Sequence, residues 1–244
     1  GMGGVTIKDT LPMPRDEKTA HVKDLPYMSP EWLDMFAYIA AECRRLGLIL
    51  RCRLGSGWNE GGPWITPEMS SQDIAFVESK PIIGPVQYSG PIPTAADGSP
   101  TIKAIRGEEA FVVAVCDAGR QRINVTDKVD DDRKLTWDVP AGTWTLVSCF
   151  SKPSGIRNAS TSLSGSGLHH DHLSKAAADV HLENVAGKML AKLGTFDDTA
   201  FDGFNTDSWE LGYPTWTPGL RKEFIARRGY DPVLYLPVLA NVKR

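Results

Sequence analysis

The sequence predicts an α/β protein whose parallel sheet is interrupted by an antiparallel, β-sandwich-like insertion. Strand and helix patterns alternate at both ends of the chain, whereas residues 84–153 show β-branched alternation, turn signals and no helical period. The length of 244 residues suits one large domain or two small ones. We therefore expect a first α/β segment at 1–83, the insertion at 84–153 and a second α/β segment at 154–244.

The first segment is expected to fold as strand, helix and strand. GGVTIKDT at 3–10 predicts a short strand. Ser29 as N-cap and Pro30 in the first helical position begin a helix, which carries apolar residues three to four positions apart and ends at Gly47. LILRCRL at 48–54 predicts the next strand, so the segment is a βα unit of a parallel sheet, whose ligands collect at the carboxyl ends of strands.

The remaining elements follow from turn signals and helix caps. FVVAVCDA, INVTDKV, KLTWDVP and TWTLVSCFS predict short strands of the insertion. A helix is expected from Ser174 to Gly194, a strand at 201–207, and a last helix from Thr217 to Gly229. Three strands do not close a barrel, so the residues alone predict either a small open sheet or a piece of something larger.

Composition excludes several classes of function. The formal net charge is −3, and the absence of a Lys/Arg cluster longer than a pair argues against nucleic acid as a partner. The sequence has no apolar run of about 18 residues, the length that a membrane span needs. The four cysteines are widely spaced without a CxxC pair, which favours free thiols over a metal site or disulfides.

A glycine-rich loop with two tryptophans, GSGWNEGGPW, follows the second predicted strand. Glycines let a backbone approach a ligand closely, and Trp58 and Trp64 offer flat faces of the kind that stack on sugar rings. Neither glycine pattern of a phosphate-binding loop is present. The alternative is that both indoles pack in the core.

Three histidines and an aspartate, His169, His170, Asp171 and His172, precede the second predicted helix. We predict no metal ligands here, because neighbours on an extended segment point to opposite faces and no HExxH spacing is present. A zinc site is the minor alternative. Asp171 is three residues ahead of Ser174 and could simply bind the amides that begin the helix.

The stretch FNTDSWELG at 204–212 places carboxylates where the last parallel strand ends. A carboxylate at that position suits α/β catalysis, and burial beside Trp209 would raise its pKa toward that of a general acid. Because side chains alternate along a strand, Asp207 and Glu210 would point to opposite faces of the sheet. Their spacing alone therefore does not make them a catalytic pair. The other interpretation is that these carboxylates simply solvate a surface loop or cap a helix.

Several ordered motifs together resemble the glycoside hydrolase family 106 α-L-rhamnosidases. They span nearly the whole chain and are GMGGVTI, ECRRLGL, GSGWNEGGPWITPE, PAGTWTL, DHLSKAAADVHLENV, GFNTDSWE and WTPGLRKEFIARRGYDPVLYLPVL. The resemblance implies a partial (β/α)8 barrel interrupted by β-rich modules. It also implies inverting hydrolysis of terminal rhamnosides, calcium at the active site, and a periplasmic or extracellular location.

Site residues follow from the same resemblance. Glu210 becomes the candidate general acid. The residues that would line the sugar pocket are Asp207, Trp58, Asn59, Trp64, Asp171, His172 and Trp209.

An inverting glycosidase also needs a general base, which the family would place after YLPVL. We therefore expect little turnover from these 244 residues alone. The alternatives are a non-catalytic carbohydrate-binding protein, or a truncated product whose open barrel edges pair with a second copy.

Overall fold

The structure, a computed structural model, describes residues 2–11, 23–116, 121–194, 198–207 and 215–239. The chain forms two compact units. One contains Gly1–Ser71 and Pro153–Pro214, and the other contains Gln72–Lys152 and Thr215–Arg244.

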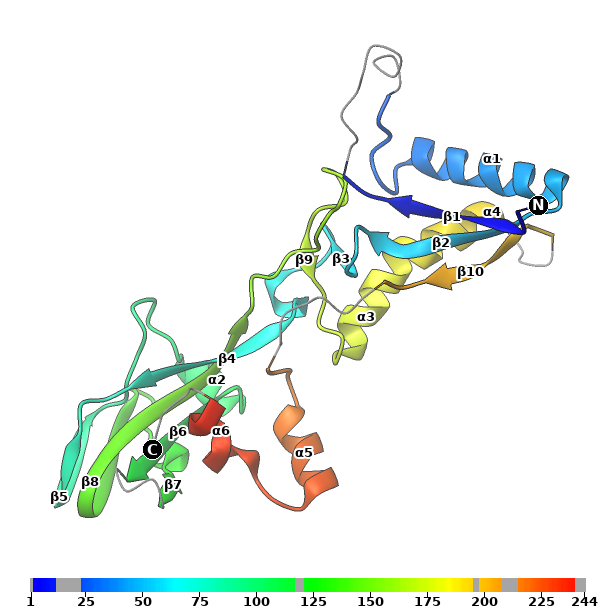
Figure 1. The fold of residues 1–244 in the computed structure, drawn as a ribbon. Helices are drawn as coiled ribbons and strands as arrows, with labels where there is room; N and C mark the ends of the chain where they lie inside the picture. Colours follow the sequence, from blue (N-terminus) through cyan, green and yellow to red (C-terminus); the bar gives the residue numbers. More distant parts are fainter. Residues whose placement is uncertain (1, 12–22, 117–120, 195–197, 208–214, 240–244) are drawn as a thin grey trace. The chain divides into compact units, whose positions relative to one another are not determined.

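The first unit is built on a three-stranded parallel sheet. Strand β2 (Ile49–Ser56) lies between β1 (Gly4–Asp9) and β10 (Phe201–Asn205), as Figure 1 shows. A second, two-stranded sheet pairs β3 (Gly61–Gly62) with β9 (Leu168–His169) in antiparallel register, with Gly61 opposite His169. A 3-10 turn, η1, covers Pro67–Met69.

Helix caps define the helices of this unit as the sequence predicts. Helix α1 (Pro30–Leu46) begins where Ser29 Oγ accepts from the amide of Trp32 at 3.2 Å, and it ends at Gly47, whose φ of 68° is left-handed. Helix α3 (Lys175–Leu182) begins at Ser174 and continues through a π-helical turn (η3, Glu183–Gly187) into α4 (Lys188–Leu193).

One face of the parallel sheet packs against these helices. The core there combines residues of α1, β2, η3, α4 and β10, namely Phe36, Ala40, Cys43, Leu50, Cys52, Val185, Met189 and Phe201. Because side chains alternate along a strand, the opposite face carries Lys8 on β1 and Arg51 and Arg53 on β2. Burial of the apolar face therefore stabilises the sheet, and its opposite face carries the charged side chains.

The mixed α/β architecture predicted from sequence is confirmed for the described residues. The barrel implied by the family resemblance stays a proposal, because three parallel strands do not close on themselves. Within the described part, β1 and β10 form the sheet's two edges, and pairing of these edges with a second copy also stays a prediction.

The second unit is a five-stranded sheet. Strand order is β4 (Gln72–Glu78), β8 (Lys134–Pro153), β6 (Ala110–Cys116) and β7 (Arg122–Asn124), and β5 (Ile82–Pro91) also pairs with β8. The β5–β8, β6–β8 and β6–β7 pairs are antiparallel. Two short helical segments, α2 (Ile102–Arg106) and η2 (Thr126–Lys128), interrupt the strands.

Strand β6 contributes to a core on each face of this sheet. Val112 and Ala114 join a cluster with Leu135, Trp137, Trp144 and Leu146. Phe111, Val113 and Val115 join a second cluster with Trp216, Val233 and Leu236 of the C-terminal segment. That segment forms α5 (Leu220–Arg228), η4 (Pro232–Tyr235) and α6 (Leu236–Leu239).

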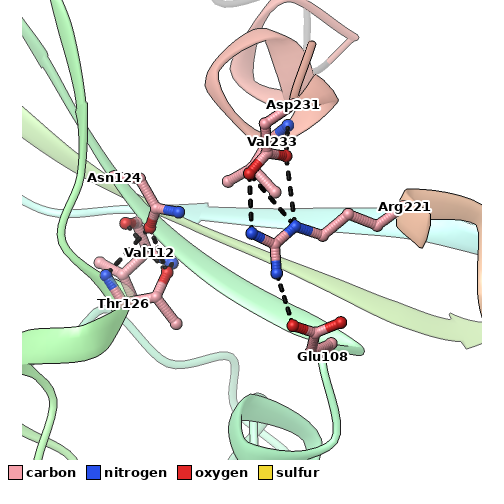
Figure 2. A network of polar contacts seen from close by, with 7 residues as sticks. All are labelled: Glu108, Val112, Asn124, Thr126, Arg221, Asp231 and Val233. Atoms are coloured by element: carbon pink, nitrogen blue, oxygen red, sulfur yellow. Dashed lines mark hydrogen bonds and ion pairs between the residues drawn. The ribbon is translucent and has the colours of Figure 1, made fainter. Parts of the chain in front are cut away.

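Arg221 anchors the C-terminal segment by ion pairs. Its guanidinium donates to Asp231 at 2.7 Å and to Glu108, which precedes β6, at 2.7 Å (Figure 2). Asp231 also caps η4 by accepting from the amide of Val233 at 3.0 Å. Figure 2 also shows Thr126 bridging Asn124 and the backbone of Val112.

The division into units differs from the expected segments. Residues from 215 onward, expected in the second α/β segment, pack on the antiparallel sheet because their apolar side chains fill one face of β6. Residues 72–78, expected in the first segment, form β4 of that same sheet. The two predicted strands KLTWDVP and TWTLVSCFS are one strand, β8, and α2 is too short to give a helical period.

Two further predictions can be compared with the described residues. All four cysteines are free thiols, as expected. None of the described helices has the length and apolar character needed to cross a membrane.

Candidate functional site

Arg53 joins the carboxyl ends of β2 and β10. Its side chain is 7% exposed and forms an ion pair through Nη1 with Asp207, two residues beyond β10. Its Nη2 donates to the backbone carbonyl of Trp58 at 2.8 Å. A single guanidinium therefore fixes both the end of the FNTD stretch and the glycine-rich loop.

Trp58 presents an accessible ring beside these charges. The residue is 40% exposed, and Lys8 Nζ lies 5.7 Å from its ring centroid. The same Lys8 ammonium lies 3.4 Å from Asp207 Oδ2. A half-exposed indole flanked by a carboxylate and two cations offers both stacking and hydrogen-bonding groups to a polar ring with apolar faces, such as a sugar.

The glycine-rich loop meets the histidine segment through close backbone contact. Gly61 has a φ of 152°, and a Cβ there would overlap the carbonyl oxygen of Leu168. The β3–β9 pairing that this glycine permits brings Glu60 close to the side chains of His169 and His172. Asn59, the neighbour of Glu60, is 2% exposed.

Two histidines and Glu60 form a compact group. The Nε2 atoms of His169 and His172 lie 3.1 Å apart, and His172 Nε2 lies 3.9 Å from Glu60 Oε2. The Nδ1 of His169 lies 2.8 Å from the carbonyl oxygen of His170, so Nδ1–H donates and Nε2 faces the group. Candidate ligand atoms of all three residues lie within 4.8 Å of one another.

Burial sets the ionisation of these groups. Desolvation is the main cause that lowers the pKa of His169 to about 4. Desolvation and the neighbouring histidines together lower the pKa of His172 to about 3. Both rings are therefore neutral at pH 7. Burial raises the pKa of Glu60, Asp207 adds to the increase, and Arg53 partly offsets it.

Calcium, which the family resemblance implies, does not match this group. Calcium takes about six to eight oxygen ligands. Among the described residues, the cluster of Glu60, His169 and His172 offers two nitrogens and one carboxylate. No chemical step is therefore assigned to calcium.

Two expected sugar-binding residues have other contacts. Trp64 packs on the helix-covered core and donates from Nε1 to His181 Nδ1 at 3.2 Å. Asp171 is 4% exposed, and its Oδ1 accepts from the amide of Leu173 at 2.9 Å. These contacts favour the core-packing interpretation for Trp64 and the helix-start interpretation for Asp171.

The remaining predicted residues divide into two sets. The structure places Trp58 and Asp207 around Arg53, and places His172 beside Glu60. Asn59 is buried next to Trp58 in the chain. Trp209 and Glu210 lie outside the described residues. The prediction of Glu210 as general acid is thus not examined by the described part of the chain.

A cavity of about 460 Å³ lies elsewhere in the first unit. It adjoins the carboxyl end of β1 and is lined by Asp9, Pro26, Trp32, Met35, Ser162 and Leu163 among others. Of the predicted sugar-pocket residues that the structure describes, none lines it. We place the candidate site at Arg53 and Trp58, because the chemistry-bearing side chains converge there.

Sequence reasoning missed three residues of the site, Lys8, Arg53 and Glu60. Arg53 had a signal, since a charged residue in the apolar strand LILRCRL must find a buried partner. Glu60 had none, because its histidine neighbours are remote in sequence and only the β3–β9 pairing brings them together.

Comparison with known proteins identifies the family of this chain. The glycoside hydrolase family 106 model, described as alpha-L-rhamnosidase, matches residues 1–118 and 115–242. The chain belongs to this family. Its family membership covers both α/β segments and the antiparallel sheet between them.

Two relatives of this family 106 chain are informative. A Formosa agariphila protein named "Putative beta-glucuronidase" is 31% identical over 246 residues, which cover 88% of this chain and 21% of the relative. The structure titled "Structure of Rhamnosidase from Novosphingobium sp. PP1Y" matches with a TM-score of 0.69 at 18% identity, covering 98% of this chain and 39% of the other. The second match shows similarity of fold. The chain thus spans about a fifth of the length of one relative and two fifths of the other.

Proposed function

We propose that this chain carries the acid side of the sugar site of a glycoside hydrolase that acts on terminal α-L-rhamnosides or related glycosides. Hydrolysis would proceed with inversion, and Glu210 would protonate the leaving oxygen. The observation that carries the proposal is the bridge from Arg53 to Asp207 and to the Trp58 carbonyl. It holds the strand end that precedes Glu210 beside an accessible indole.

The groups around Trp58 suit a neutral sugar ring. The indole would stack on the apolar face of the sugar, and Asp207, which is 36% exposed, would accept hydrogen bonds from ring hydroxyls. Lys8 and Arg53 donate to Asp207 and keep its oxygens oriented. Trp209 is proposed as a further pocket wall by family resemblance.

Binding tests the sugar site without requiring turnover. In calorimetric titration with L-rhamnose and methyl α-L-rhamnoside, Trp58→Ala should weaken binding roughly fivefold, because a stacked aromatic ring contributes about 1 kcal/mol. Tyr38→Ala is the matched control, since Tyr38 is an exposed aromatic on α1, away from the site. Equal affinity in wild type and Trp58→Ala would remove Trp58 from the site. D-glucuronate as a third ligand tests the substrate class named for the Formosa relative.

Turnover tests the catalytic assignment. We expect slow cleavage by these 244 residues. Inversion needs a second carboxylate about 6.5–9.5 Å from the acid, and the sequence identifies only Glu210 as a catalytic residue. Cleavage of an aryl α-L-rhamnoside that Glu210→Gln abolishes would support the acid and contradict slow turnover. Proton NMR of the first product anomer decides between inversion and retention. Binding without cleavage at any protein concentration favours a carbohydrate-binding protein.

A further inference from the structure

We propose that Glu60, His169 and His172 bind a divalent first-row transition metal, with zinc the best match. This inference is independent of the proposed sugar chemistry. The three residues come from the loop after β2 and from the end of β9, and their ligand atoms lie within 4.8 Å of one another. Two imidazoles and one carboxylate are a common zinc donor set that leaves a fourth position open.

The nitrogen spacing fits coordination. With zinc–nitrogen distances of about 2.0–2.1 Å, two tetrahedral ligand nitrogens lie roughly 3.3 Å apart. The two Nε2 atoms here are 3.1 Å apart. A direct N–H···N hydrogen bond would account for the distance between the two nitrogens. It would not account for the partly buried carboxylate of Glu60, which lies 3.9 Å from the same His172 nitrogen.

The surroundings also orient one ligand. His169 Nδ1 is held by the His170 carbonyl at 2.8 Å, an arrangement that fixes the ring of a metal-bound histidine and directs Nε2 to the metal. His169, at 0% exposure, is closed to bulk water, while Glu60 and His172 retain 13% and 14% side-chain exposure. The site is therefore buried on one side and accessible to a metal on the other.

A bound metal would join two segments that are remote in sequence. Glu60 lies in the loop whose backbone Arg53 holds at Trp58, and the histidines lie before α3. Coordination would thus clamp the glycine-rich loop to the histidine segment. Zinc binding should raise the unfolding temperature of the first unit, because a ligand that binds only the folded state stabilises it.

Metal binding is measured directly on the full chain without a polyhistidine tag. After dialysis against a chelator, zinc loading and desalting, elemental analysis should find about one zinc per chain. Cobalt as a probe should give the visible absorption of a four-coordinate site. Glu60→Gln and His172→Gln should each weaken zinc binding at least roughly 100-fold, and a hundredfold excess of calcium should not displace zinc.

Matched variants separate ligation from general damage. Glu68→Gln removes an exposed carboxylate from the same part of the chain, and His170→Gln removes a buried ring next to the ligands. Both should keep zinc. Absence of zinc in the wild type, or unchanged affinity in both ligand variants, would overturn the proposal. If His172→Gln fails to fold by circular dichroism, the nearly isosteric Glu60→Gln decides by the same criterion. Failure of rhamnose binding leaves this result unaffected.

Discussion

At the scale of the residue, Arg53 is the side chain on which the candidate site depends. Arg53→Lys keeps the charge but cannot bind Asp207 and the Trp58 carbonyl together, because an ammonium lacks the guanidinium fork. We expect roughly tenfold weaker sugar binding and a loss of about 1–3 kcal/mol in unfolding free energy. Calorimetry and urea unfolding measure the two effects.

The neighbouring strand residue supplies the control. Arg51 also lies on β2 and pairs with Asp202, but its side chain is 58% exposed. Because exposed ion pairs contribute little, Arg51→Lys should leave both quantities nearly unchanged. Similar losses in both variants would show that Arg53 has no special role.

Single residues also show where sequence reasoning ends. Trp58 and Asp207 both contact Arg53, as expected for loops that follow parallel strands and meet at one edge of a sheet. Trp64 lies in the same glycine-rich loop as Trp58, but it packs in the core and its indole N–H donates a hydrogen bond to His181. Which indole faces solvent depends on packing between helix and sheet, and local sequence does not encode it.

At the scale of the element, His181 couples α3 to β2. It is 1% exposed, its Nε2 donates to the Leu54 carbonyl at 2.7 Å, and its Nδ1 accepts from Trp64. Burial, with a smaller contribution from nearby His170, lowers its pKa to about 4. A protonated ring would set two donors, Nδ1–H and the indole N–H, against each other.

This depressed pKa predicts acid sensitivity. The unfolded chain binds a proton near pH 6.5 and the folded chain only near pH 4, so stability is complete above pH 6.5 and falls as pH decreases toward 4. His181 alone should account for roughly 3 kcal/mol of that loss. Urea unfolding is measured at several pH values with chelator present. Between pH 4 and 6.5, the His181→Gln variant should take up about one proton fewer on unfolding than the wild type does. An unchanged pH slope would contradict the assignment.

Elements were predictable where local signals and tertiary packing agree. Ser29, Pro30 and Gly47 delimit α1 in the sequence and in the structure. Strand β4 was missed because its residues alternate weakly and its partner, β8, lies far along the chain. The packing of Trp216, Val233 and Leu236 on the antiparallel sheet was missed for the same reason, since an apolar pattern predicts a buried face but not its partner.

At the scale of the whole molecule, two units predict two unfolding transitions. Gly61→Ala would force a Cβ against the Leu168 carbonyl and should lower only the transition of the first unit. Asp231→Asn would remove the charged partner of Arg221 and should lower only that of the second. Each change should shift its midpoint by several degrees in differential scanning calorimetry. Gly3→Ala, where a Cβ meets no neighbour, is the control. A single transition that both variants lower equally would contradict independent units.

The pairing of Gly61 with His169 has a consequence for how the protein is made. Strands β4 to β8 all lie between these partners along the chain. Because the ribosome synthesises the N-terminal end first, most of the antiparallel sheet is made before the histidine segment can pair with the glycine-rich loop. Closing so long a loop is slow. We therefore expect the group of Glu60, His169 and His172 to assemble late in folding, after the insertion has had time to fold. Slow folding of the insertion would then delay the first appearance of metal binding.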